Sequence, residues 1–355
     1  MLAFIKKQAK DLFPGYFAFI MATSALSIGC SLLNMDFVSK LLLYVNGGAY
    51  LWLWFLTLIR IILFFPQFWN DLISHTKGPG FFTLIAGTSM LGSQLIIVGN
   101  EPRIALYLWY WAIFLWIVIM YIFFTAVTVR KHKPSLAKGI NGAWLIAAVA
   151  TQSISIVGTL LVPHFKANHT ILLFFTLCMY LLGCMLYLNI ITFIFYRFIF
   201  VDFKYESLTP PYWINMGAVA ITTLAGSSLI LHAEYWSMLQ ELKPFLKGFT
   251  LFFWVTGTWW IPLLFILMIW RYVVHRYPLS YDPQIWGMVF PLSMYTAGTF
   301  QLSKAINVSF LIWIPKAMVF VAMAMWLVAF VGMCHRMFSK LRVTDEKKDK
   351  TPILP

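Results

Sequence analysis

Of the 355 residues, 61% are hydrophobic and only 11% are charged, and this balance excludes a soluble domain of ordinary composition. The formal net charge is +14, but the basic residues lie in short segments between long apolar runs, so the charge requires no nucleic-acid partner. The chain is therefore expected to be an all-α integral membrane protein in contact with membrane lipid.

Apolar runs long enough to cross a bilayer core of roughly 30 Å as helices recur along the chain. Residues 1–12 are predicted to be a cytoplasmic N-terminus before a retained first helix rather than a signal peptide, because a second run begins almost immediately. Residues 13–334 are predicted to form one transmembrane domain, and residues 335–355 a solvated cytoplasmic tail. The ten predicted spans are 13–33, 41–65, 81–99, 104–128, 139–161, 171–196, 211–231, 249–270, 283–303 and 317–333.

Lysine and arginine alternate between the loops. If the N-terminus lies inside, the cytoplasmic side holds 19 of the 26 basic residues when Arg60, near the inner end of its span, is counted with the segments there. An excess of basic residues marks the cytoplasmic side of membrane proteins. We therefore expect a multi-pass protein of the cell membrane with both termini in the cytoplasm.

The odd-numbered and even-numbered spans differ in composition. Gly, Ala, Ser, Thr, Asn and Gln make up 50 of 105 residues in the odd spans but only 23 of 115 in the even spans. The even spans are instead rich in large apolar and aromatic side chains that suit lipid. Because a pair of helices with this contrast occurs five times, the sequence predicts five helical hairpins, with an inner ring of odd helices around a central pore and an outer ring of even helices.

Two interpretations of the small and hydroxylated inner helices stay open. Small residues allow helices to pack closely, whereas hydroxyls that face a pore can exchange hydrogen bonds with a partly hydrated ion. Five helices of one kind, rather than one packed pair, favour the pathway. The candidate pore-lining residues are Thr23, Ser27, Thr88, Ser89, Ser93, Thr151, Ser155, Thr223, Ser227, Ser293 and Thr296.

The inner spans contain no Asp, Glu, Lys, Arg or His. Pumps and ion-coupled carriers commonly keep an ionisable group at membrane depth, so this absence favours channel-like or facilitated passage. No acidic ring marks a cation path, which favours a small anion as substrate. Arg60, the only charge within a predicted span, is interpreted as a structural anchor.

No catalytic motif or metal-ligand spacing stands out, so neither an enzyme nor a cofactor nor a metal site is predicted. The four cysteines are interpreted as packing residues. The alternative to a transporter is a non-conducting membrane sensor or assembly protein whose small-residue helices merely pack.

Four segments carry a family resemblance: "FPGYFAFIMATSALSIG" (13–29), "FFTLIAGTSMLGSQ" (81–94), "TPPYWINMGAVAITTLAGSS" (209–228) and "YDPQIWGMVFPLSMYTAGTF" (281–300). They resemble the tellurite-resistance/dicarboxylate transporter family, which includes TehA-like bacterial proteins, yeast malate and sulfite transporters and plant slow anion channels. The resemblance implies five hairpins around a pore, a homotrimer, and transport of anions such as C4-dicarboxylate, sulfite, tellurite, chloride or nitrate. Which anion is transported, and whether by a channel or a coupled carrier, stays open.

The ninth predicted span has a proline in its middle. Pro291 has no N–H and crowds the carbonyl of Gly287, which predicts a helix kink at Gly287 and Pro291. The residues alone favour a packing role for Phe290, whereas the resemblance implies that Phe290 is the phenylalanine that closes the pore.

Overall fold

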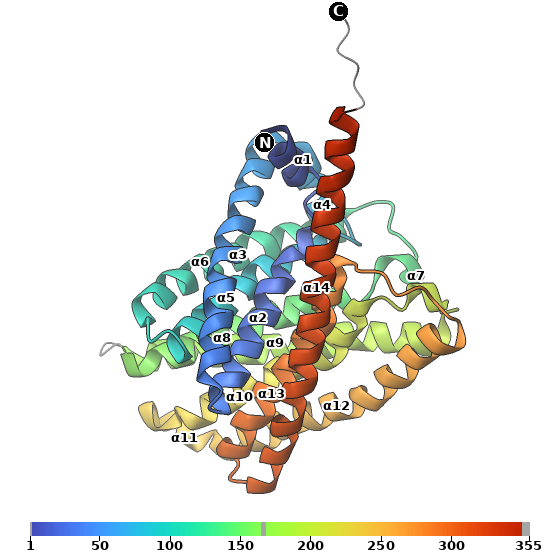
Figure 1. Cartoon of the computed structure of the whole chain (residues 1–355). Coiled ribbons are helices and arrows are strands. Elements are labelled where there is room, and N and C mark those ends of the chain that lie inside the picture. The colour runs from blue at the N-terminus through green and yellow to red at the C-terminus, as the bar shows by residue number, and fades with distance from the viewer. Residues whose placement is uncertain (1, 165–167, 350–355) are drawn as a thin grey trace, which may run out of the picture.

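The computed structural model describes residues 2–164 and 168–349, which fold into helices joined by short loops (Figure 1). Among the described residues, nine helices are long and apolar enough to cross a membrane. The prediction of an all-α integral membrane protein is confirmed.

Five segments rich in small residues begin in the same way, with a short 3₁₀ turn that leads into an α-helix. Proline and glycine at these positions suit the tight first turn, where a missing N–H costs no helical hydrogen bond. In the four of these segments that are among the nine candidate spans, 83% to 94% of the residues in the apolar window are buried. The five are η1 (Pro14–Phe17) with α2 (Ala18–Leu32), η2 (Gly78–Phe81) with α5 (Phe82–Ile97), η3 (Gly142–Leu145) with α8 (Ile146–Leu161), η6 (Pro210–Trp213) with α10 (Ile214–Leu231), and η9 (Pro283–Ile285) with α13 (Trp286–Ala305).

Five longer helices alternate with these segments and are much more exposed. Only 22% to 44% of the residues in their apolar windows are buried, and large apolar side chains cover the remaining surface. Such surfaces suit the hydrocarbon core of a bilayer. The five are α3 (Asp36–Leu63), α6 (Pro102–Val129), α9 (His169–Phe200), α12 (Lys243–Ile269) and α14 (Trp313–Asp349).

The buried helices close a ring. Helix α2 packs against α5, α5 against α8, α8 against α10, α10 against α13, and α13 returns to α2. Each exposed helix packs against the buried helix that precedes it in the chain, as α3 does on α2 and α12 on α10. Figure 1 shows α12 and α14 running along the outside of this arrangement. We call the five buried helices the inner ring and the five exposed helices the outer ring.

Helix α13 is the part of the ring that corresponds to the predicted span 283–303. It is not among the nine candidate spans, because its glycines, hydroxyl side chains and Lys304 make it less apolar. Nearly all of its residues are nevertheless buried by α2, α10 and α14. A helix enclosed by other helices needs small residues for close packing more than it needs a lipid-compatible surface.

Short elements connect the long helices. Helix α1 and the C-terminal end of α14 lie at the same end of the molecule (Figure 1). The predicted N-terminus 1–12 contains α1, and residue 1 lies outside the described residues. The helix α14 continues through much of the predicted tail 335–355, of which 350–355 lie outside the described residues. The connecting elements are α1 (Leu2–Lys10), α4 (Phe65–Leu72), α7 (Leu136–Gly139), η4 (Val162–His164), η5 (Tyr205–Ser207), η7 (Ala233–Tyr235), α11 (Ser237–Glu241), the π-helical turn η8 (Trp270–Val274) and η10 (Ser309–Ile312).

Candidate functional site

Helix α13 lies between α10 and α2, and glycines mark its contacts with both. A Cβ atom added to Gly217 of α10 would lie 2.6 Å from Pro291 Cγ, and one added to Gly298 would lie 2.7 Å from the carbonyl oxygen of Ala220. On the other side, a Cβ on Gly29 of α2 would lie 3.4 Å from Thr296 Cγ2. These close approaches fix which face of α13 meets each neighbour.

The side chain of Phe290 lies on the sector of α13 between its two ring neighbours. Successive helical residues are rotated by about 100°, so Phe290 is about 100° from Pro291, which faces α10. Trp286, one turn earlier, packs its ring against Phe19 of α2, with centroids 4.7 Å apart. Tyr295, whose hydroxyl is 2.8 Å from Thr258 of α12, lies on the opposite side of the helix. Phe290 therefore points toward the interior of the inner ring, where it is only 1% exposed.

Five of the candidate lining residues, all in α2, α5 and α8, form hydrogen bonds to outer helices. These bonds join the two rings and orient the hydroxyls toward the outer ring. Trp326 Nε1 donates to Thr23 Oγ1 (3.0 Å), Trp116 Nε1 donates to Thr151 Oγ1 (2.9 Å), Ser27 Oγ donates to the carbonyl of Ser39 (2.7 Å), Ser155 Oγ donates to the carbonyl of Thr176 (2.7 Å), and the hydroxyls of Thr88 and Tyr50 are 3.0 Å apart.

The other candidate lining residues fall into two groups. Thr223, Ser293 and Thr296 donate to carbonyls four residues earlier in their own helices, at 2.8, 3.0 and 3.1 Å. The hydroxyls of Ser89, Ser93 and Ser227 are buried and have no hydrogen-bond partner among the described residues. Ser89 and Ser93 lie one turn apart on α5, so their hydroxyls share one side of that helix.

The predicted kink lies within an unbroken helix. Helix α13 runs from Trp286 to Ala305 with Pro291 inside it, and the carbonyl of Gly287 loses the N–H that would normally bond to it. A Cβ on Gly287 would be 3.4 Å from Pro211, so this glycine is less crowded than Gly298. The bend itself stays a prediction.

A buried polar cluster joins α2, α3 and α5 and was not anticipated from the sequence. Asn46 Nδ2 lies 2.8 Å from both Ser24 Oγ and Gln94 Oε1, and Ser24 Oγ donates to Gln94 Oε1 at 3.2 Å. All three residues are fully buried. The usable signal was an isolated amide within an otherwise apolar outer helix, because such amides commonly bond across helices in membranes.

Arg60 is an anchor, as predicted, but through buried contacts. Its Nη1 donates to the carbonyl of Leu12 (2.8 Å) and its Nη2 to Asp71 (2.6 Å), and the residue is only 4% exposed. Lys77 also pairs with Asp71, at 2.9 Å. The arginine thus ties the end of α3 to the start of the first inner segment.

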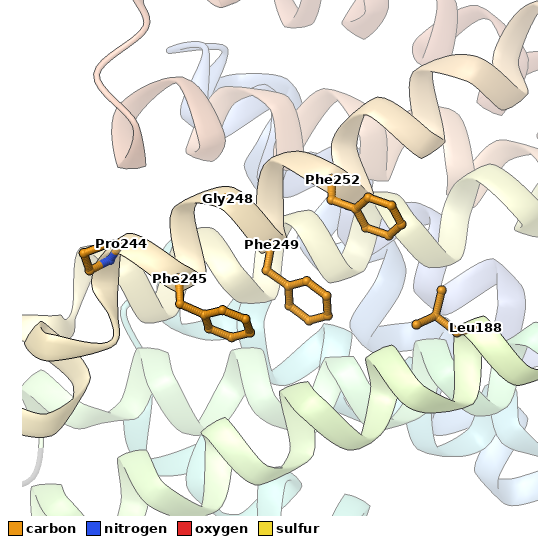
Figure 2. Close-up of a pocket in the computed structure, with 6 residues that line it drawn as sticks. All are labelled: Leu188, Pro244, Phe245, Gly248, Phe249 and Phe252. Atoms are coloured by element: carbon orange, nitrogen blue, oxygen red, sulfur yellow. The ribbon is translucent and has the colours of Figure 1, made fainter.

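A groove on the outer surface lies away from these residues. Figure 2 shows that it runs between α9 and α12, and its lining residues are Leu188, Pro244, Phe245, Gly248, Phe249 and Phe252. This lining consists of apolar side chains and a glycine, on the face where the sequence predicts lipid. The groove therefore offers no group to hold an anion.

The family model for voltage-dependent anion channels matches residues 11–334. The chain belongs to this family. Among its relatives, an uncharacterized transporter of Methanocaldococcus jannaschii is 24% identical over 348 residues, which cover 94% of this chain and 97% of the relative. A second uncharacterized transporter of that organism is 24% identical over 342 residues, covering 93% and 94%. An uncharacterized membrane protein of Mycobacterium tuberculosis is 37% identical over 152 residues, covering 43% of this chain and 77% of the relative. The match spans the whole inner ring of this voltage-dependent anion channel family member.

Proposed function

We propose that the protein conducts a small anion through the interior of the inner ring and that Phe290 closes this pathway. The observation that carries the proposal is the orientation of Phe290. It is a large side chain on the side of α13 that faces the interior of the inner ring, between the two neighbouring helices that α13 contacts. A bulky side chain at that position obstructs any path along the ring axis.

The buried hydroxyls of Ser89, Ser93 and Ser227 support this proposal, because no group in the described part of the chain accepts a hydrogen bond from them. A weakly held anion needs such donors when it sheds part of its hydration shell. We therefore propose that, of the candidate pore-lining residues, these three serines line the pathway together with Phe290. Thr23, Ser27, Thr88, Thr151 and Ser155 bond to the outer ring and are proposed to set the rotation of the inner helices.

The substrate is proposed to be a C4-dicarboxylate, sulfite, tellurite or a small inorganic anion, and the protein is proposed to form a homotrimer in the cell membrane with both termini in the cytoplasm. A flux panel in proteoliposomes that covers malate, sulfite, tellurite, chloride and nitrate identifies the anion. Dependence of the flux on a proton gradient separates a coupled carrier from a channel. Native mass spectrometry measures the oligomeric state.

Replacing Phe290 by alanine tests the gate. The substitution removes the ring from the pathway, so the anion flux of Phe290→Ala should exceed that of the unmodified protein several-fold. The matched control is Phe253→Ala, since Phe253 is equally buried but lies on α12 of the outer ring. This control should lose stability without gaining flux.

Two outcomes would contradict the proposal. If correctly folded Phe290→Ala conducts no more than the unmodified protein, Phe290 is a packing residue. If neither protein moves any anion of the panel, the chain is better explained as a non-conducting sensor or assembly protein.

A further inference from the structure

Arginines at the ends of outer helices hold the starts of inner segments. Arg60 donates to the carbonyl of Leu12, and Arg336 of α14 donates to the carbonyl of Tyr281 at 2.8 Å. Arg197 of α9 donates to the carbonyl of Ile140 and, at 2.6 Å, to the hydroxyl of Tyr212. In all three hairpins the acceptor carbonyl lies two residues before the 3₁₀ turn that opens an inner segment. The contact thus recurs in three of the five hairpins.

Arg271 occupies the same place in the fourth hairpin but lacks these partners. Like Arg60 and Arg197, it lies three residues before the end of its helical segment. The equivalent acceptor would be Leu208, two residues before η6, yet Nη1 of Arg271 is buried without a hydrogen-bond partner among the described residues. Its Nε is also buried and unpartnered there, as it is in Arg60 and Arg197. The residue is only 5% exposed. The ion pairs found in the described part of the chain both involve Asp71, so no carboxylate neutralises Arg271 there.

The local backbone explains why Arg271 is displaced from the repeated arrangement. The end of α12 widens into the π-helical turn η8, and the N–H of His275 bonds to the carbonyl of Trp270 at 3.1 Å. A π turn inserts one residue and rotates the following side chains relative to an α-helix, and such turns frequently occur at functional sites. Arg271 instead stacks against Tyr277, with its guanidinium carbon 4.0 Å from the ring centroid.

Further basic side chains lie around this turn. His275 stacks on Tyr205 of η5, with centroids 4.4 Å apart, and Arg276 follows it in the chain. Lys204 lies just before η5, and the carboxylate of Glu206 within η5 is close enough to interact with both Lys204 and His275. Basic groups outnumber acidic ones here, and a buried guanidinium without a counter-charge is unfavourable.

We propose that Arg271 binds a phosphate oxyanion beside η8. The ring of Tyr272, whose centroid is 5.2 Å from the guanidinium carbon, and the ring of Tyr277 hold the guanidinium in place. A guanidinium presents paired N–H groups that match two oxygens of a phosphate, and an anion there would satisfy the unused donors and the charge together. The oxyanion comes either from the headgroup of a phospholipid with a net negative charge or from soluble phosphate. The site lies beside the outer ring, so it does not depend on the proposed conduction path.

The experiment uses the full chain in nanodiscs and measures the thermal unfolding midpoint by tryptophan fluorescence. One arm titrates inorganic phosphate into discs of phosphatidylcholine, and the other compares those discs with discs that contain phosphatidylglycerol. Binding to the folded state raises the midpoint. A rise with inorganic phosphate identifies a soluble ligand, and a rise with phosphatidylglycerol alone identifies a headgroup; either result supports the site if Arg271→Gln abolishes it.

Arg130→Gln is the matched control, because Arg130 lies at the exposed end of α6 and its removal changes the net charge equally. This variant should respond as the unmodified protein does. If Arg271→Gln cannot be purified folded, Arg271→Lys keeps the charge but loses the paired donors, and its affinity should fall by at least about fivefold. The proposal is overturned if the unmodified protein responds in neither arm, if Arg271→Gln responds as strongly as Arg130→Gln, or if Arg271→Lys binds with unchanged affinity.

Discussion

Gly298 allows α13 to approach α10 closely, and a single added methyl group tests that contact. In Gly298→Ala the Cβ atom would lie 2.7 Å from the carbonyl oxygen of Ala220, whereas ordinary contact distances begin at 3.4 Å. The carbonyl oxygen that the methyl group would meet belongs to the backbone and not to the end of a flexible side chain. The two helices must therefore separate by several tenths of an ångström. The substitution would therefore strain the inner ring of helices where α10 contacts α13.

The expected magnitude combines two opposing contributions. Overpacking a tightly packed interior costs about 1–3 kcal/mol, and replacing glycine by alanine within a helix returns about 0.5–1 kcal/mol. The net loss in the free energy of unfolding is therefore about 1–2 kcal/mol. In a thermal unfolding assay in detergent this loss corresponds to a decrease of roughly 2–6 °C in Tm.

Gly48→Ala is the matched control, because a Cβ atom there has nothing within 4 Å on the exposed side of α3. It should keep or slightly raise Tm, since only the helix-propensity gain applies. If Gly298→Ala and Gly48→Ala unfold at the same temperature, the close approach between α10 and α13 is not a determinant of stability and the reasoning is refuted.

Three further substitutions test buried polar contacts by Tm. Asn46→Ala leaves the Gln94 side chain without its Asn46 donor and should lower the free energy of unfolding by about 1–3 kcal/mol. Asn189→Ala, on the exposed face of α9, should be nearly neutral, and equal losses in the two variants would contradict the role of the cluster. Arg60→Gln should also cost about 1–3 kcal/mol, and adding Asp71→Asn should cost less than the sum of the two single changes, while strict additivity would show that the pair is not coupled. Burial lowers the pKa of His232, so this imidazole binds a proton more readily in the unfolded chain than in the folded protein. The free energy of unfolding should therefore fall as the pH drops through about 6.5. His232→Gln should make the free energy of unfolding depend less on pH, and an unchanged dependence would assign it to other groups.

The two classes of helix could be predicted from composition because burial by protein and exposure to lipid select different side chains. Helices enclosed on all sides, such as α8, admit small residues, while α6 presents large apolar groups to the bilayer. The rotation of each inner helix could not be predicted. The small and hydroxylated residues of α2 and α5 lie on all sides of each helix, so no single face stands out in the sequence. Only the tertiary hydrogen bonds show that Thr23 and Thr88 contact the outer ring.

The buried arginines were missed for a related reason. The predicted spans end at residues 196 and 270, one residue before Arg197 and Arg271, because a charged side chain reads as the end of an apolar run. In the structure both helical segments continue through the arginine. Tyr212 of η6 contacts Arg197, and Tyr277 of the next loop stacks on Arg271. Burial by a following loop is a tertiary effect that a count of apolar residues along one helix does not contain.

The hydrogen bonds between the rings also bear on how a pathway could be selective. Because Thr23, Ser27 and Ser155 bond outward, they hold the inner helices at a rotation that turns other residues inward. On α13 the inward sector carries Phe290 and, one turn later, Met294, both buried and without a charge. Under the proposed function, an anion therefore meets a bulky apolar constriction with few donors nearby. Selectivity would then depend on how easily each anion sheds its water rather than on a charged binding group, so weakly hydrated anions should pass more readily than strongly hydrated ones.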